Sequence, residues 1–371
     1  MEITLSRDLI INPFQLVAGA VARKPTIPVL SHILCEFNGD ELHIQATDNE
    51  ILLSASITLE EPVSEPCRLT LPARKFIDIC RSLPENAQIT LYFNDPSHVK
   101  LHSGHSRFTL ASLPAEDFPT LDIAQSQHSI QLQQNTLKRL LEKTMFSMAQ
   151  QDVRSFLNGM LFHIQPNNIF QVVTADGHRL SASTINELDA ADNEYQVIVP
   201  RKGILELNRL LSADDEQPMT VSFSSQHIKI ECAEFTFVSK LLTGTFPDIN
   251  RIVPKANLNQ LVLDRDAFRQ ALQRVAILSS DKHNSVRLEI QSSALKIVTH
   301  NPDQEEAEEM IDAQLEGQPC TIGFNIRYLL DVLDVMSSGF VTISFVDDNS
   351  SVLITHETDT QSFYIVMPMR L

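Results

Sequence analysis

The residues best able to support catalysis are few in this chain of 371 residues. Asp176 and His178 stand two positions apart in the segment DGHRL, and a carboxylate near an imidazole could give a hydrolase an acid and a base. Two such side chains tend to share one face of a strand, and no nucleophile stands near them in the sequence. A hydrolase is therefore an alternative, although a lone histidine is more often structural than catalytic.

Five carboxylates within seven positions form a second candidate site, which could hold a cation. They are Asp303, Glu305, Glu306, Glu308 and Glu309. A bound metal ion needs oxygen ligands that converge, whereas a strand sends alternate side chains to opposite faces. An acidic rim that faces a basic partner is the better interpretation, and no metal is expected.

Other catalytic and cofactor motifs are missing from the sequence. It contains no phosphate-binding loop, no GxGxxG fingerprint, no HExxH motif and no nucleophile elbow. The five cysteines have no CxxC pair and are expected to be reduced thiols in a reducing compartment: Cys35, Cys67, Cys80, Cys232 and Cys320. The sequence therefore predicts a protein that is not an enzyme and needs no cofactor.

One sequence pattern, written three times, organises the chain. Each copy reads as a strand end, an amphipathic helix, a turn and a new strand. The copies are residues 70–93, 197–223 and 320–345. Their period, 127 residues from Arg74 to Arg201 and 124 from Arg201 to Asn325, indicates three copies of a whole domain. We expect domains at residues 1–125, 126–253 and 254–371.

A second amphipathic helix opens each copy. These helices are expected at residues 6–24, 135–154 and 264–279. Asn135 and Asp264 are plausible N-caps, and short alternating strands follow each helix. Asp48, Asp176 and Asn301 occupy equivalent positions where one strand turns into the next. Each copy should therefore be α+β, with two half-units that each place one helix on a small antiparallel sheet.

The formal net charge of −18 argues against a nucleic-acid partner when the chain is taken as a whole. The expected helices differ from this average, because they hold 17 of the 29 Lys and Arg but only 9 of the 47 Asp and Glu. The positions counted are 7–24, 72–83, 135–154, 200–212, 264–279 and 323–337. Helix propensity does not explain so few Glu residues. A basic helical surface would let an acidic protein hold a polyanion on one face.

The N-terminus MEITLSRDLI lacks a basic region followed by an apolar one, and no run of eighteen apolar residues occurs. The sequence therefore predicts neither a signal peptide nor a membrane span, and a cytoplasmic location is expected.

Several collinear segments resemble the family of the bacterial sliding clamp, the beta subunit of DNA polymerase III. They are PARKFIDICRSLP (72–84), FSMAQQDVR (146–154), LNGMLF (157–162), DGHRL (176–180), VPRKG (199–203), FPDINRIVPK (246–255), NPDQEEAEE (301–309) and VMPMRL (366–371). The resemblance covers the full length and implies three similar domains per chain. It also implies that two chains close head to tail into a ring, with helices inside and sheets outside.

Helix spacing agrees with a ring of two chains. Neighbouring helix axes lie about 8–10 Å apart, so the six helices of one chain would make a ring only about 15–19 Å wide. Twelve helices make a ring of roughly 30–38 Å, which leaves room for a duplex. A closed dimer is therefore large enough to encircle DNA, and a single chain is not.

The resemblance implies a processivity factor that encircles duplex DNA and tethers the replicative polymerase. Contacts with DNA should be electrostatic and without base reading, because sliding requires that no register be preferred. The residues that the resemblance places at DNA are Arg23, Lys24, Gln151, Arg154, Phe156, Arg201 and Lys202. Ser155 stands where the family often has an aromatic residue.

The resemblance also implies an apolar, Met-rich cleft between the second and third domains. Short peptides of the replicative polymerase, the clamp loader and repair polymerases would bind there. Its residues would be Leu157, Gly177, His178, Arg179, Leu180, Pro247, Arg251, Ile252, Asn325, Tyr328, Ser351, Ile365, Met367, Pro368, Met369 and Arg370. Ala175 and Asn349 stand where other members carry different residues. Without the resemblance, Met367 and Met369 would be read as strand core.

A third set of residues would form the dimer interface between the first domain of one chain and the third domain of the other. One side would consist of Arg74, Lys75, Arg81, Arg107, Phe108 and Leu110. The other side would consist of Ile277, Leu278, Asp303, Glu305, Glu306, Glu308 and Glu309. Opposite charges and joined edge strands would then hold the seam together. A peptide-binding scaffold that never touches DNA is the remaining alternative.

Overall fold

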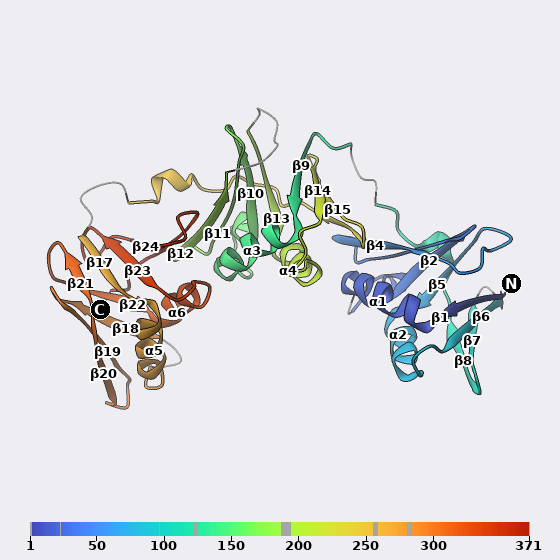
Figure 1. The fold of residues 1–371 in the computed structure, drawn as a ribbon, viewed down its shortest axis with the longest axis horizontal. Helices are drawn as coiled ribbons and strands as arrows, with labels where there is room; N and C mark the ends of the chain where they lie inside the picture. Colours follow the sequence, from blue (N-terminus) through green and yellow to red (C-terminus); the bar gives the residue numbers. More distant parts are fainter. Residues whose placement is uncertain are drawn as a thin grey trace. The chain divides into compact units, whose positions relative to one another are not determined.

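The computed structural model describes residues 2–22, 24–95, 97–121, 125–186, 194–254, 259–279 and 284–370. The chain divides into two compact units (Figure 1). The first unit contains Met1–Asn135 and Leu205–Leu241, and the second contains Thr136–Ile204 and Leu242–Leu371.

Two antiparallel sheets form the first unit. Their strand orders are β1-β6-β7-β8 and β5-β2-β3-β4-β16-β15-β14-β9. The strands are β1 (Glu2–Ser6), β2 (His32–Asn38), β3 (Glu41–Thr47), β4 (Ile51–Thr58), β5 (Cys67–Pro72), β6 (Gln88–Asp95), β7 (His98–Ser103), β8 (Ser106–Ala111), β9 (His128–Gln133), β14 (Pro218–Phe223), β15 (His227–Glu231) and β16 (Thr236–Lys240).

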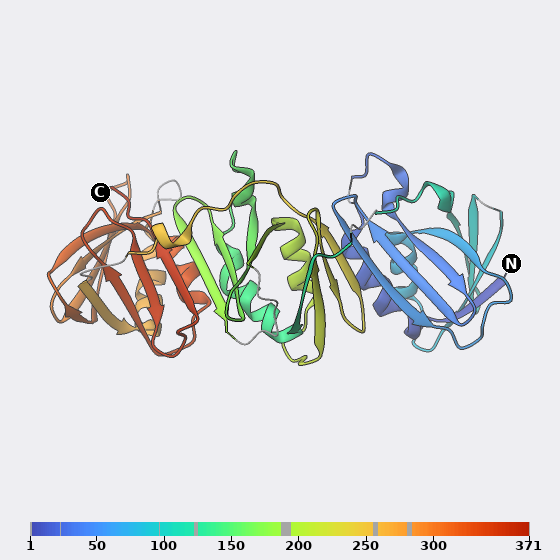
Figure 2. The same cartoon turned by 90° about the horizontal axis from the view of Figure 1, so that it is seen from above.

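The helices α1 (Arg7–Val17) and α2 (Ala73–Ser82) pack together in the first unit, with the rings of Phe14 and Phe76 4.7 Å apart. Figure 2 shows the blue strands β2, β3 and β4 lying across α1. The helix α4 (Arg201–Leu210) follows β13 in the chain. Amphipathic helices on antiparallel sheets confirm the α+β prediction.

Two further antiparallel sheets form the second unit. Their orders are β13-β10-β11-β12-β25-β24-β23-β17-β21 and β20-β19-β18-β22. The strands are β10 (Gly159–Gln165), β11 (Ile169–Ala175), β12 (Arg179–Ile185), β13 (Tyr195–Pro200), β17 (Asn259–Asp264), β18 (Ser285–Ile290), β19 (Ala294–His300), β20 (Glu306–Asp312), β21 (Gln314–Glu316), β22 (Cys320–Asn325), β23 (Phe340–Phe345), β24 (Val352–His356) and β25 (Ser362–Val366). The helices are α3 (Gln134–Thr144), α5 (Arg265–Ala276) and α6 (Ile326–Asp334).

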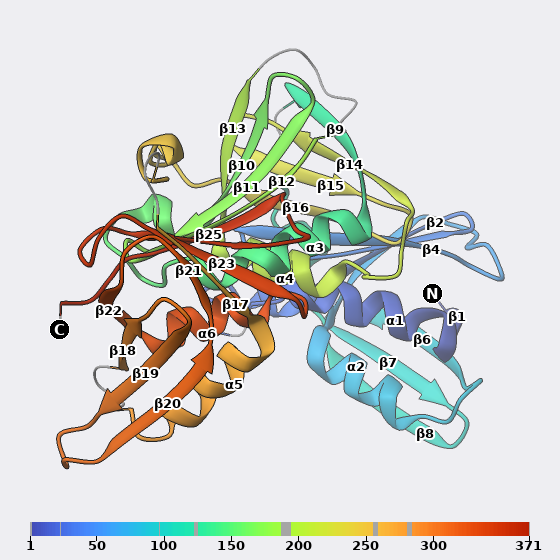
Figure 3. The ribbon, with the colours of Figure 1, turned by 60° about the vertical axis from the view of Figure 1, so that its left-hand side comes forward.

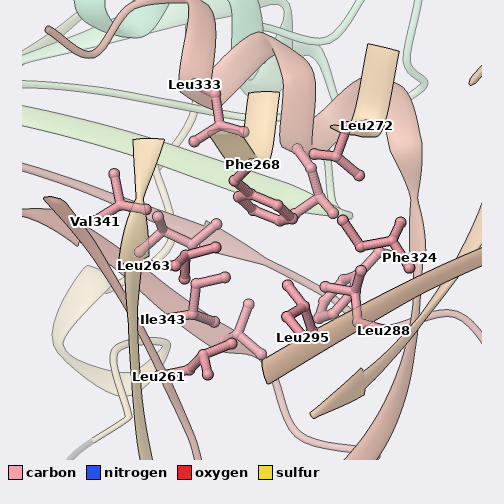
Figure 4. Packing of buried hydrophobic residues seen from close by; sticks show 14 of the residues in the cluster. Leu261, Leu263, Phe268, Leu272, Leu288, Leu295, Phe324, Leu333, Val341 and Ile343 are labelled. Atoms are coloured by element: carbon pink, nitrogen blue, oxygen red, sulfur yellow. The ribbon is translucent and has the colours of Figure 1, made fainter. Parts of the chain in front are cut away.

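A buried cluster joins α5 and α6 to the sheets on either side of them (Figures 3 and 4). Phe268 and Leu272 of α5 meet Leu333 of α6, Phe324 of β22 and Leu263 of β17 in this cluster. In α5 the buried positions recur at intervals of three and four residues, which places them on one face of the helix. Phe268 is 1% exposed, so its truncation to Ala would cost about 3–5 kcal/mol.

Each copy begins with a strand that the sequence analysis missed. These strands are β1, β9 and β17, and each directly precedes the first helix of its copy. In β1 the alternation of exposed Glu2 and Thr4 with buried Ile3 and Leu5 is the signal that could have revealed it.

The two half-units of each copy exchange their leading strands. β1 pairs with β6 of the second half, whereas β5 pairs with β2 of the first half. The same exchange joins β9 to β14 and β13 to β10, and then β17 to β23 and β22 to β18. The expectation of two half-units, each with one helix on a small antiparallel sheet, did not include this exchange, by which each half completes the sheet of the other.

The helix expected at 135–154 ends at Thr144, ten residues early, and is followed by a 3-10 turn at Met145–Ser147. Side chains from elsewhere satisfy the carbonyls at this end: Thr174 Oγ1 donates to Thr144 O, and Arg179 Nη2 donates to Phe146 O. The helix expected at 6–24 likewise ends at Val17 and continues only as a 3-10 turn at Ala18–Ala20.

The two predicted N-caps have different outcomes. Asp264 caps α5 by accepting from Ala267 N at 2.8 Å, as predicted. Asn135 lies inside the first turn of α3, which begins at Gln134, so that prediction was wrong.

Candidate functional site

Arg179, at the start of β12, connects more elements than any other side chain of the proposed peptide site. Its Nε donates to Asp176 Oδ2 at 3.0 Å, and its Nη1 donates to Asp331 Oδ2 of α6 at 2.5 Å. Its guanidinium lies 4.4 Å from the ring centroid of Tyr328 and 5.3 Å from that of Phe146. The side chain is 11% exposed. Arg179 is therefore held in one orientation by two carboxylates and two rings.

The DGHRL segment is a tight turn built by Asp176. The carboxylate Oδ1 accepts from the backbone N–H groups of His178 at 2.9 Å and Arg179 at 3.0 Å. Gly177 has a φ of +90°, and a Cβ there would lie 2.6 Å from Arg154 Nη2. The backbone conformation therefore favours glycine, and a Cβ would also require the flexible Arg154 side chain to shift.

The same turn chemistry recurs at the other two predicted positions. Asp48 Oδ1 accepts from the N–H groups of Glu50 and Ile51, both at 2.9 Å. Asn301 Oδ1 accepts from Asp303 and Glu305. Each residue stands between two paired strands, so the predicted equivalence is confirmed.

His178 is an exposed ring stacked on Tyr328, with 6.4 Å between centroids. The neighbouring Asp176 carboxylate is occupied by backbone N–H groups and by Arg179. An acid–base pair for hydrolysis would need these groups to face a substrate. The Asp176 carboxylate instead serves the turn and the His178 ring stacks on Tyr328, which removes the basis of the hydrolase alternative.

Buried side chains form the floor beside Arg179. Leu157, Leu180 and Ile365 are 2%, 3% and 1% exposed and belong to one apolar cluster. β12 and β25 pair there, with Leu180 opposite Ile365. Met367 is 49% exposed, and its N–H donates to His178 O at 2.8 Å. The reading of Met367 as strand core is therefore wrong, because β25 ends at Val366.

The remaining residues of the proposed peptide site surround this floor without all touching it. Met369 N–H donates to Gly323 O, and Asn325 caps α6 by accepting from Arg327 N. Arg251 and Ile252 are exposed, at or just after a 3-10 turn. The other members are intermediate or exposed: Pro247, Ser351, Pro368 and Arg370.

Two residues that hold Arg179 were not identified from the sequence. Asp331 and Phe146 supply a carboxylate, a carbonyl and a ring. Asp331 stands three positions after Tyr328 on α6, so the helical period already placed both on one face. That spacing was the available signal.

Several proposed DNA contacts lie on a loop and not on a helix. Gln151 has a φ of +58°, and Arg154 is exposed. Arg154 donates to both oxygens of Asp152 at 3.0 and 2.8 Å, which lowers the pKa of that carboxyl to about 2. Asn158 exchanges two hydrogen bonds with the Asp152 backbone, so the loop has a defined shape.

The other proposed DNA contacts have varied surroundings. Arg201 Nη1 donates to Met148 O at 3.2 Å, and Lys24 and Lys202 are exposed. Phe156 is half-buried in the apolar cluster and therefore contributes to packing. Arg23 lies outside the described residues.

Most helical cations are neutralised by acidic side chains of the same chain. The pairs are Arg7–Asp8, Arg81–Asp78, Lys138–Glu142, Lys143–Asp359, Arg209–Glu206, Arg265–Asp266, Arg269–Asp334 and Arg274–Glu309. Arg74, Lys75 and Arg139 are exposed. Six of these acidic partners lie on the helices and are already subtracted in the helical surplus, so only the pairs with Asp359 and Glu309 reduce the positive potential further.

The residues proposed for the dimer interface lie on several elements. Arg107, Phe108 and Leu110 belong to β8, and Glu306, Glu308 and Glu309 belong to β20. Arg74, Lys75 and Arg81 belong to α2, Ile277 and Leu278 follow α5, and Asp303 and Glu305 precede β20. β8 is the last strand of its sheet, and β20 is the last strand of another. Arg107 is exposed on β8, whereas Leu110 is 5% exposed and packs inward, so Leu110 offers little surface to a partner. Ile277 is 78% exposed, and Phe108 and Leu278 are half-buried.

The acidic run is partly used within the chain. Glu309 binds Arg274 at 2.7 and 3.0 Å, and Glu308 binds Lys296 at 2.8 Å. Within the described ranges, no three His, Cys, Asp or Glu side chains form a group that could hold a metal ion.

All five cysteines are free thiols, as predicted. Cys35 and Cys80 are buried, and burial raises the pKa of the Cys80 thiol to about 12. Such thiols remain protonated and unreactive at neutral pH. Among the described helices, none is long and apolar enough to cross a bilayer.

The repeated helix-on-sheet domains belong to the class of DNA sliding clamps, as matches to known proteins show. Models of the DNA polymerase III beta subunit match its N-terminal domain at residues 1–122, its central domain at 131–248 and its C-terminal domain at 250–370. The beta sliding clamp of Pseudomonas putida is 46% identical over 371 residues, which is 100% of each chain, and that of Escherichia coli is 42% identical over the same span.

Solved structures agree with these sequence relatives. The crystal structure of the DNA polymerase III subunit beta from Pseudomonas aeruginosa has a TM-score of 0.96 and 42% identity, with 100% of each chain covered. A further structure from Pseudomonas aeruginosa is a sliding clamp bound to griselimycin, with a TM-score of 0.95. The chain therefore belongs to the family of the DNA polymerase III beta subunit. Its function is that of a DNA sliding clamp, and it is not an enzyme.

Proposed function

We propose that two copies of this chain close into a ring around duplex DNA and tether the replicative polymerase. The supporting observation is the order in which the sheets join. Two strand pairings connect successive copies of the repeat. In each, the last strand of one copy's first half-unit pairs with the last strand of the next copy's second half-unit: β4 pairs with β16, and β12 pairs with β25. Strand β20 ends the first half-unit of the third repeat, and β8 ends the second half-unit of the first repeat. The same kind of pairing would therefore join β20 of one chain to β8 of a second chain, since both strands are sheet edges.

Three domains follow from this proposal, at residues 1–125, 126–253 and 254–371. At the seam between two chains, the exposed Arg107 of one chain would face Glu306, the first residue of β20, in the other chain. Opposite charges across the seam favour this pairing over unrelated partners.

The proposed peptide site would bind short segments of the polymerase, the clamp loader and repair polymerases. Arg179 and Tyr328 form one side, and the exposed Met367 adds a flexible apolar contact. DNA would be held by electrostatic contacts that are independent of base sequence, and the protein would act in the cytoplasm.

Retention on plasmids tests the ring. The protein would be loaded onto nicked circular plasmid by the clamp loader with ATP and then separated by gel filtration. We expect it to stay on circles and to be lost when a restriction enzyme linearises them. Equal retention on linear and circular DNA would refute a ring, and retention on neither would favour a peptide-binding scaffold.

Deletion of Met367–Leu371 tests whether the proposed peptide site and the proposed dimer seam are distinct surfaces. We expect the shortened chain to lose polymerase binding while sedimentation still shows a dimer. Monomers after the deletion would contradict the separation of seam and peptide site.

A further inference from the structure

A hollow of about 870 Å³ lies beside the proposed peptide site and has no assigned role. Its walls are one face of the sheet that contains β10, β11 and β13 and the segment 245–253. This volume lies within the range of small-molecule and peptide pockets. Pro247 and Arg251 line the hollow and also belong to the proposed peptide site.

The sheet face in this hollow changes from apolar to polar between two adjacent rows of the strand register. The apolar row runs across five strands through Ile198, Leu161, Val173, Ala182 and Phe363, and of these Leu161 and Phe363 line the hollow. The polar row runs across four strands through Gln196, His163, Gln171 and Thr184. A ligand lying along the strands would therefore meet apolar and hydrogen-bonding groups in succession.

Hydrogen bonds fix the polar row in place. Gln165 Nε2 lies 3.2 Å from His163 Nδ1 and donates to Gln171 Oε1 at 3.2 Å. Gln196 Nε2 donates to Glu194 Oε1 at 3.2 Å. The side-chain carbonyl oxygens of Gln165 and Gln196 accept no hydrogen bond from any described residue, so both can accept from a peptide N–H.

Glu194 gives the hollow a negative charge. Its carboxylate accepts from His163 Nε2 at 2.8 Å and is 56% exposed. The hydrogen bond with His163 lowers the pKa of Glu194, so the carboxylate is ionised at neutral pH. Asp248 lies at the same hollow but is paired with the exposed Arg251 at 3.3 Å, which leaves Glu194 as the main counter-charge.

The apolar part of the hollow continues into the floor of the proposed peptide site. Leu161 and Phe246 of the hollow belong to the same buried cluster as Leu157, Leu180 and Ile365 of that floor. The hollow and the floor therefore lie over one apolar cluster, and Pro247 and Arg251 belong to both proposed surfaces.

We propose that the hollow extends the peptide site and binds a basic, extended stretch of the partner polypeptide next to its short motif. An aliphatic side chain packs on Leu161, the amide oxygens of Gln165 and Gln196 accept from the peptide backbone, and a Lys or Arg pairs with Glu194. This inference rests on the proposed function, because the motif itself must occupy the neighbouring site.

Matched peptides test the inference. An overlapping array of the catalytic subunit of the same organism's replicative polymerase gives the shortest segment that the full clamp retains. Five fluorescent peptides are then compared. They are the segment alone, the segment with Gln-Lys-Gln-Lys added at one end or at the other, and the segment with Gln-Glu-Gln-Glu added at one end or at the other. We expect the lysine extension at one end to bind about threefold to tenfold tighter than the segment alone. Salt of about 0.5 M should remove most of the gain.

Two variants locate the effect. Glu194→Gln should abolish the gain from lysine and leave the short segment unchanged, whereas Glu316→Gln, which removes an exposed carboxylate on β21, should change neither. If the short segment binds normally and the lysine extension does not tighten binding, the inference is overturned while the proposed peptide site stands. An equal gain from glutamate, or a gain that survives Glu194→Gln, also overturns it. Failure of every segment to bind overturns the proposed peptide site together with the inference.

Discussion

Reversal of one charge at the proposed seam should weaken the dimer by a predictable amount. Arg107 is exposed on the edge strand β8, and Glu306 begins the edge strand β20. The Glu306 side chain forms no hydrogen bond or ion pair with any residue that the structure describes, whereas the side chains of Glu308 and Glu309 bind Lys296 and Arg274. In the proposed seam, we therefore expect the Arg107→Glu change to act largely through Glu306.

The expected magnitude follows from the exposure of both groups. An exposed ion pair contributes about 0.5 kcal/mol, and reversal replaces this attraction by a repulsion of similar size. The loss is then about 1 kcal/mol per seam. A closed ring of two chains has two seams, so the dimer loses about 2 kcal/mol, which is roughly a 30-fold rise in its dissociation constant.

Sedimentation equilibrium of the wild type, Arg107→Glu, and the double variant Arg107→Glu with Glu306→Lys measures this constant. The double variant should recover most of the loss, because the pair is restored with its signs exchanged. Raised salt should narrow the difference between wild type and Arg107→Glu. An unchanged constant in Arg107→Glu, or no recovery in the double variant, would refute the pairing of these strands.

Three further predictions concern the second unit. Arg179→Ala should lower the free energy of unfolding in urea by about 2–4 kcal/mol, because Asp331 loses a partly buried partner. Gly177→Ala should cost about 1–3 kcal/mol in the same assay, because its φ of +90° is strained for alanine. The Asp152 carboxyl should titrate near pH 2 by NMR, and Arg154→Ala should move the midpoint upward. The stability from this pair is then present above about pH 4 and lost as the pH falls toward 2.

Matched controls distinguish these effects from general damage. Arg68→Ala removes an exposed ion pair with Glu36 and should cost less than about 1 kcal/mol. Gly39→Ala has a φ of +59° with no atom within 4 Å of the added Cβ, so it should cost less than Gly177→Ala. Equal losses within either comparison would contradict the contacts assigned to Arg179 and Gly177.

The repeated helices were predictable because their apolar positions recur with the helical period. In α6 the buried residues Ile326, Leu329, Val332 and Leu333 follow that spacing closely. The leading strands were missed because β1 is only five residues long and runs directly into α1. Their exchange between half-units could not be predicted, because it depends on pairing between segments far apart in the sequence.

The candidate site was predictable in its residue types and only partly in their partners. The DGHRL segment carries its own turn chemistry, so Asp176 and Gly177 could be placed in a turn. The end of α3 could not be predicted, since it depends on Thr174 binding the carbonyl of Thr144 and on Arg179 binding the carbonyl of Phe146 in the following 3-10 turn. The roles assigned to DNA-contacting, peptide-binding and seam residues remain predictions.

The pairing of β4 with β16 has a consequence for synthesis of the chain. Ser54 of β4 lies opposite Thr236 of β16 in the sheet. During synthesis, β4 therefore leaves the ribosome long before the strand with which it pairs. At the usual pace of translation the delay is roughly 10–40 s. Throughout that interval the nascent polypeptide presents an unpaired edge at Ile51–Thr58, which is a natural target for ribosome-associated chaperones.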